Sequence, residues 1–199
     1  MFKAFKLTAA AALMATASMA IADTAGLNDF RALTAIEVET PETAMTAVMK
    51  PVEVADEASA MKGVLQADDR IAFELGGVAG SKIYILNMDS AGTIQMIYPN
   101  KFVEGGVALE EDTMAVPAAD ATYEFEVSGE GGTEVVKVIA IDGESSAFDT
   151  LIASLFDTEK AFPRAIQPAE KTTEALNAFF VSSSDAEIRD TTLEYVIAK

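Results

Sequence analysis

The feature that most constrains the fold is a β-hairpin pattern within residues 81–101. Two apolar runs, residues 83–88 and 93–98, flank a turn at residues 89–92 that contains Asp and Gly. Aspartate and glycine favour tight turns, and β-branched and aromatic residues favour strands. The first run is largely apolar on both faces, which is typical of a strand covered from both sides. The segment therefore predicts two antiparallel strands inside a layered, β-rich domain.

Apolar and polar residues also alternate elsewhere in the chain, and residues 134–141 form a β-branched run, and both patterns predict further strands. These strands are expected at residues 71–75, 114–117, 123–127, 134–141 and 193–197. Between the last two, apolar residues recur at helical spacing in segments 148–156 and 169–180, and Ser146 with Asp149 resembles a capping box. Strands at short intervals followed by late helices predict a mainly β fold. We expect an antiparallel β-sandwich with one or two helices, α+β in overall content.

The N-terminus has the pattern of an export signal. Lys3 and Lys6 precede an uncharged stretch of small and apolar residues, and an Ala-x-Ala site ends at Ala22. The stretch is shorter than the roughly 20 residues that a membrane-spanning helix needs. We therefore expect cleavage after Ala22, no membrane span in the mature chain, and a periplasmic or secreted protein.

Residues 23–62 show weaker patterns than the rest of the chain. The interval is rich in Ala, Thr, Glu and Val, and two prolines interrupt it. Apolar residues at three-residue spacing indicate a short helix or an extended anchor near its start. These residues are Leu27, Phe30, Leu33 and Ile36. We expect a linker or N-terminal arm lying on a β-sandwich domain formed by residues 63–199.

Composition excludes several kinds of active site. The chain has no cysteine and no histidine, which excludes disulfides, thiolate or histidine zinc sites, and Ser-His-Asp triads. Its 32 acidic residues outnumber 14 basic ones, for a formal net charge of −18 at pH 7. Nucleic acid binding is disfavoured, because lysine and arginine are needed to replace counterions. The composition therefore favours a protein that is not an enzyme.

A series of motifs follows in a characteristic order between residues 65 and 140. They are DRIAF (69–73), KIYILNMD (82–89), GTI (92–94), IYPN (97–100), VP (116–117), YEF (123–125) and GTEVVKVIA (132–140). In this order they resemble the bacterial domain of unknown function 4384. The resemblance implies an exported or envelope-associated accessory module that binds a partner supplied by another chain. It implies no catalytic residues and no cofactor.

The first candidate binding surface consists of Tyr98, Asn100 and Lys101, at the end of the second hairpin strand. An aromatic ring, a rigid proline and two polar side chains at a strand end can form a recognition surface. A structural role explains the same residues, with Tyr98 at the edge of the core and Asn100 capping the turn. Pro99 would end the strand pairing because it has no N–H. We expect the surface to contact another envelope protein or a surface polymer.

The second candidate is a site for a hard cation, built from loop carboxylates. Asp89 lies in the hairpin turn and Glu111 lies in an acidic cluster at residues 110–112. Calcium prefers such oxygen ligands, but the spacing of an EF-hand is missing, and a turn role alone explains Asp89. The acidic clusters at residues 68–69 and 110–112 would suit a hydrolase only if carboxylates faced each other across a cleft.

Three hypotheses follow, and they differ in what they predict. The first is a non-enzymatic, exported binding module of the cell envelope, which should present an exposed edge strand or an apolar patch. The alternative is a cation-stabilised or small-ligand-binding periplasmic domain, whose thermal stability should rise with ligand occupancy. The third is a carboxylate-based hydrolase, which should have a deep cavity holding a carboxylate with a raised pKa.

Overall fold

The computed structural model describes residues 26–33, 45–103, 110–129, 131–143, 145–183 and 188–199, and its strands form two sheets. The smaller, four-stranded sheet has the order β1-β3-β6, and β7 also pairs with β3. All of its pairings are antiparallel. The strands are β1 (Thr46–Glu53), β3 (Arg70–Gly76), β6 (Thr113–Val116) and β7 (Phe125–Glu126).

The larger sheet has seven strands in the order β2-β11-β8-β4-β5-β10-β9. Its pairings are antiparallel except for β2 with β11, which run parallel. The strands are β2 (Val64–Leu65), β4 (Ser81–Met88), β5 (Ile94–Tyr98), β8 (Gly132–Asp142), β9 (Phe156–Asp157), β10 (Arg164–Ala165) and β11 (Ile188–Ile197). The predicted hairpin is confirmed as β4 and β5, and the predicted C-terminal strand as part of β11.

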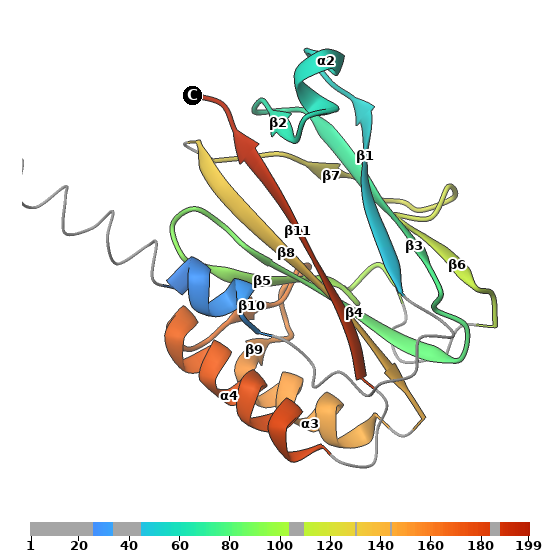
Figure 1. The fold of residues 1–199 in the computed structure, drawn as a ribbon, viewed down its shortest axis with the longest axis vertical. Helices are drawn as coiled ribbons and strands as arrows, with labels where there is room; N and C mark the ends of the chain where they lie inside the picture. The colour runs from blue at the N-terminus through green and yellow to red at the C-terminus, as the bar shows by residue number, and fades with distance from the viewer. Residues whose placement is uncertain (1–25, 34–44, 104–109, 130, 144, 184–187) are drawn as a thin grey trace, which may run out of the picture.

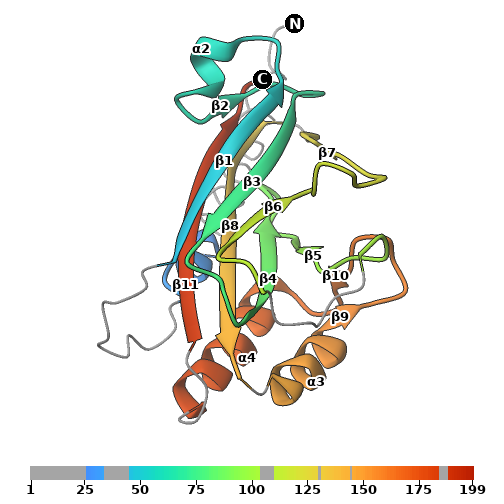
Figure 2. The same cartoon turned by 90° about the vertical axis from the view of Figure 1, so that its right-hand side faces the viewer.

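The molecule has three layers, with the larger sheet in the middle (Figure 1, Figure 2). The smaller sheet covers one face of the larger sheet, and helices cover the other. The helices are α3 (Ser146–Leu155), α4 (Ala169–Ser182) and a short helix at residues 26–31, while α2 (Glu57–Ala60) follows β1. The predicted mainly β sandwich with late helices is therefore confirmed.

Two apolar cores hold the layers together, and β8 contributes to both. Because successive side chains of a strand point to opposite faces, Val136 and Val138 pack between the sheets, whereas Val135 and Ile139 pack against the helices. All four are fully buried. This explains why the sequence of β8 is a nearly continuous apolar run.

The two late helices form where the apolar spacing predicts them, but the predicted capping box is wrong. Ser145, not Ser146, is the N-cap residue of α3, and its side chain makes no capping hydrogen bond. Asp149 is engaged elsewhere, since its carboxylate accepts hydrogen bonds of 2.6 Å from Lys82 Nζ and from Tyr84 Oη. Asp149 therefore ties α3 to β4 instead of capping its own helix.

The interval 23–62 contributes to both sides of the fold. The helix at residues 26–31 buries Leu27 and Phe30 in the helix-side core, and Leu33 follows them, so the predicted anchor is helical. On the other side, β1 pairs with β3 along its length. The linker expected here is thus partly a strand of the smaller sheet, although Ile36 lies outside the described residues.

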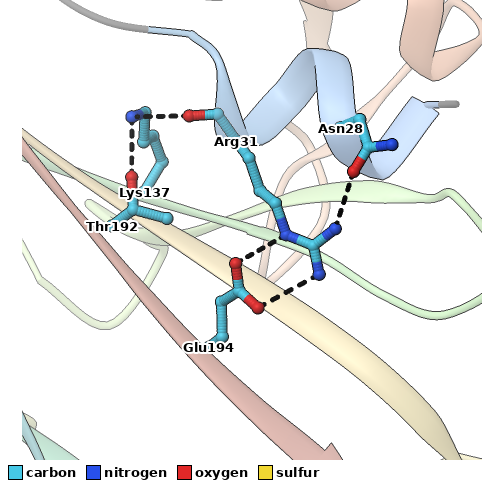
Figure 3. A network of polar contacts seen from close by, with 5 residues as sticks. All are labelled: Asn28, Arg31, Lys137, Thr192 and Glu194. Carbon is cyan, nitrogen blue, oxygen red and sulfur yellow. Dashed lines mark hydrogen bonds and ion pairs between the residues drawn. The ribbon is translucent and has the colours of Figure 1, made fainter. Parts of the chain in front are cut away.

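Polar contacts fix the helix at residues 26–31 to the larger sheet (Figure 3). Arg31 forms a two-pronged ion pair with Glu194 of β11, with N···O distances of 2.5 and 3.0 Å. The backbone carbonyl of Arg31 accepts a 3.5 Å hydrogen bond from the buried Lys137 Nζ. That ammonium also bonds Thr192 at 2.7 Å and pairs with Asp190 at 2.6 Å.

The expected export signal, including Ala22, lies outside the described residues. Within the part of the chain that the structure describes, no helix has the length and apolar character needed to cross a membrane.

Candidate functional site

A cavity of about 580 Å³ runs beside strand β6. All four residues of β6 line it, together with the loops on either side of this strand. Among the described residues, the lining includes three aromatic side chains, three carboxylates and no lysine or arginine. These side chains are Tyr98, Phe102, Tyr123, Glu110, Glu111 and Asp120. We call this feature the β6 cavity.

Two aromatic side chains of the β6 cavity, Phe102 and Tyr123, belong to a larger cluster. Phe102 stacks on Tyr123 with ring centroids 5.4 Å apart and an interplanar angle of 21°. Tyr123 in turn makes edge contacts with Phe125 at 5.5 Å and with Phe162 at 6.0 Å. Phe102 is nevertheless 52% exposed. An exposed aromatic ring held by stacking is a preorganised contact surface.

Of the three residues of the predicted binding surface, Tyr98 lies apart from Asn100 and Lys101, which line the same depression. Tyr98 lines the β6 cavity, where burial and the nearby Tyr123 raise the pKa of its phenol. Lys101 is exposed and lines a different, shallower depression beside Lys82. Asn100 is only 7% exposed. Its side chain donates to the carbonyl of Ile97 and accepts from the N–H of Phe102, both at 2.9 Å, so it caps the turn.

The predicted cation ligands have separate surroundings. One carboxylate oxygen of Asp89 accepts hydrogen bonds from the N–H groups of Ala91 at 3.0 Å and Thr93 at 2.7 Å, as a turn residue does. Glu111 lines the β6 cavity. Across the described ranges, no group of three or more carboxylates is arranged to hold a metal ion.

In the acidic pair at residues 68–69, the side chain of Asp69 is hydrogen-bonded within the fold. Asp69 is buried, and its two carboxylate oxygens accept hydrogen bonds of 2.8 Å from the N–H groups of Ala55 and Gln66. These bonds join β3 to the segments around α2 and β2. Asp69 therefore has a structural role.

A second cavity, of about 340 Å³, lies between the two sheets and was not predicted from the sequence. Glu134 of β8 lies in its wall and is only 5% exposed. Its Oε2 accepts hydrogen bonds from Tyr195 Oη at 2.7 Å and Asn87 Nδ2 at 2.8 Å. Burial raises the pKa of Glu134, and these two hydrogen bonds partly oppose that effect. We call this feature the inter-sheet cavity.

Glu134 has one property that the hydrolase hypothesis requires, a raised pKa within a cavity. Hydrolysis of a glycoside also needs a second carboxylate across the scissile bond. The other carboxylates of this wall, Glu124 and Glu126, are exposed, and Glu124 pairs with Arg70 at 3.3 Å. The arrangement therefore offers binding groups more readily than an acid–base pair.

The sequence held a signal for the inter-sheet cavity. Asn87 and Gln95 are polar residues within otherwise largely apolar strands, and Glu134 opens the apolar run of β8. A polar residue at an inward-facing strand position needs a partner, because burying it unpaired is costly. The pairing of the strands, which brings these residues together, was not available from the sequence.

The fold is that of a β-rich sandwich domain with accessory helices. The described residues that line the β6 cavity and the inter-sheet cavity offer carboxylates, amides, aromatic rings and the guanidinium of Arg164 as binding groups. Residues 64–142 match the family model described as Domain of unknown function (DUF4384), and this part of the chain belongs to that family. The match extends from β2 to the end of β8. Comparison with curated proteins and with solved structures gave no match.

Proposed function

We propose that this protein is an exported, non-enzymatic binding module that docks a basic, extended segment of another envelope protein in the β6 cavity. The observation that carries the proposal is the lining of this cavity, in which the described residues combine carboxylates with aromatic rings and include no basic side chain. The export pattern and the absence of histidine and cysteine support the same class of protein.

The edge position of β6 supports docking by strand addition. β6 is the last strand in the order β1-β3-β6, and in the described part of the chain no strand pairs with its other edge. Figure 1 shows it at the border of the smaller sheet. An unpaired edge can take an extended peptide as an additional strand, with the backbone giving affinity and side-chain pockets giving specificity.

The charges around the β6 cavity select the partner's side chains. Glu110, Glu111 and Asp120 surround aromatic rings whose faces attract cations. A lysine or arginine of an added strand would meet both groups at once. The strongly acidic chain would also speed the approach of a basic partner. Lys101 lines the other depression and would not oppose this contact.

Peptide binding by isothermal titration calorimetry tests the proposal. The probe is a short peptide of alternating lysine and valine, in which alternation places every lysine on one side of the added strand. One control peptide has glutamate in place of lysine, and a second keeps the lysines but has proline in place of valine. We expect the first peptide alone to bind, and more weakly at high salt.

Variants of the protein locate the binding surface. Phe102→Ala and Glu111→Gln should each weaken binding of the lysine–valine peptide by about tenfold. The matched control is Glu57→Gln in α2, an exposed carboxylate outside the cavity, which should leave the affinity unchanged. An equal loss in the control would show binding to overall charge and refute the proposed site. Equal binding of the proline peptide would refute strand addition.

A further inference from the structure

Polar side chains form a row across the inner face of the larger sheet, one from each of five neighbouring strands. In strand order β11-β8-β4-β5-β10 they are Tyr195, Glu134, Asn87, Gln95 and Arg164. Directly opposed residues of paired strands lie on the same face, and the pairing places Tyr195 opposite Glu134 and Gln95 opposite both Asn87 and Arg164. All five line the inter-sheet cavity.

The surroundings of this row are those of an apolar core. On the same face of the sheet, the neighbouring positions of β4 and β8 include Ile83, Ile85, Val136 and Val138, all buried. A carboxylate in such a place loses hydration, and no lysine or arginine of the described chain pairs with Glu134. The row therefore has an energetic cost that packing alone does not explain.

Two acceptors of the row lack donors within the described chain. Asn87 Oδ1 is buried and has no hydrogen-bond partner. Both hydrogen bonds to Glu134 reach Oε2, so Oε1 receives none among the described residues. A buried acceptor without a donor, such as Asn87 Oδ1, destabilises a fold, and its position in a cavity wall indicates an external donor.

The other end of the row supplies donors. Gln95 carries an amide, and the guanidinium of Arg164 is exposed and forms no ion pair with any described residue. Phe125 and Phe162 line the same cavity, with ring centroids 6.0 Å apart. The cavity thus combines unused acceptors, unused donors and aromatic surfaces.

We propose that the inter-sheet cavity binds an uncharged sugar unit. Adjacent hydroxyl groups would donate to Glu134 Oε1 and Asn87 Oδ1 and accept from Gln95 and Arg164, while the C–H face of the ring packs against Phe125 or Phe162. Three carboxylates and one guanidinium line the cavity, which opposes anionic ligands. The volume of about 340 Å³ lies in the range of small-molecule sites. The proposal is independent of peptide docking at β6.

Saturation-transfer NMR and thermal shift on the full chain test this proposal. The probes are glucose, galactose, N-acetylglucosamine and oligomers of N-acetylglucosamine, with putrescine and acetate as charged comparisons. Tighter binding of the oligomers than of the monomer would assign the sugar to a polymer, and equal binding would assign it to a free sugar. A sugar at 100 times its Kd should raise Tm by roughly 5–10 °C.

Side-chain replacements then connect binding to the row. Gln95→Met and Arg164→Met should each weaken sugar binding by about tenfold while leaving the melting temperature of the free protein close to that of the wild type. The matched control, Gln167→Met, changes an exposed glutamine outside the cavity and should leave binding unchanged. The proposal is overturned if no sugar binds, if putrescine or acetate binds instead, or if both row variants bind like the control.

Discussion

Replacing Phe30 with alanine tests whether the helix at residues 26–31 is part of the folded domain. Phe30 is 0% exposed and packs in the core between the larger sheet and the helices. Truncating a buried phenylalanine to alanine typically costs about 3–5 kcal/mol, because apolar contacts are lost and a cavity remains. At about 2–4 °C per kcal/mol for a chain of this size, Phe30→Ala should lower Tm by roughly 6–20 °C.

Two controls separate this packing from other effects. Val181→Ala removes apolar atoms from a side chain of α4 that is 66% exposed, and should change the unfolding free energy by less than about 0.5 kcal/mol. Arg31→Ala removes the partly exposed ion pair with Glu194 and should cost no more than about 1 kcal/mol. The measurement is urea unfolding followed by circular dichroism. A loss below about 1 kcal/mol for Phe30→Ala would refute the claim that this helix is seated in the core.

Three further perturbations test the polar groups of the fold. Lys137→Met should lower the unfolding free energy, measured in urea, by about 3–5 kcal/mol because the carboxylate of Asp190 loses its buried ammonium partner. The control Lys171→Met removes an exposed ion pair of α4 and should lower it by less than about 1 kcal/mol. The pKa of Glu134 is raised in the folded state above its ordinary value of 4.5. At pH values between these two, the Glu134 carboxyl is ionised in the unfolded chain and protonated in the folded one, so the unfolding free energy falls as pH rises. Unfolding measured across this range should show that Glu134→Gln lacks this decline and is at least as stable as the wild type near neutral pH. A chelator should leave the wild-type Tm unchanged because two turn N–H groups already hold one carboxylate oxygen of Asp89 and no cluster of acidic residues in the described ranges is arranged around a metal ion. A fall in Tm would instead support the cation-stabilised alternative.

Elements with strong local patterns could be predicted from the sequence. The hairpin of β4 and β5, strand β8 and helices α3 and α4 all have apolar periods that match their observed structure. The sequence pattern of β1 is weak because its inward-facing side chains are only half-buried, apolar Val48 and Val52 lie on its exposed face, and Pro51 interrupts it. A proline is tolerated there because β1 is at the edge of the smaller sheet. A strand is hard to predict from the sequence when it has neither a continuous apolar run nor a regular alternation of apolar and polar residues.

The candidate sites were less predictable because they depend on pairing between distant strands. The sequence places Tyr98 beside Asn100 and Lys101, but the fold turns Tyr98 toward β6 and uses Asn100 to close a turn. Conversely, Asn87 and Glu134 are 47 residues apart in the chain and share a hydrogen bond. Strand register decides such contacts, and a shift by one residue would move a side chain to the other face.

The extent of the family match also bears on how the domain is stabilised. The matched segment, residues 64–142, includes β4 and β8, whose helix-facing side chains include Leu86 and Ile139. The buried side chains that cover this face come from outside the segment: Phe30, Phe148, Leu176 and Phe180. Without them, the larger sheet would expose a continuous apolar surface, which folded monomers rarely present. The folding unit of this chain therefore extends beyond the matched segment, from the helix at residues 26–31 to β11.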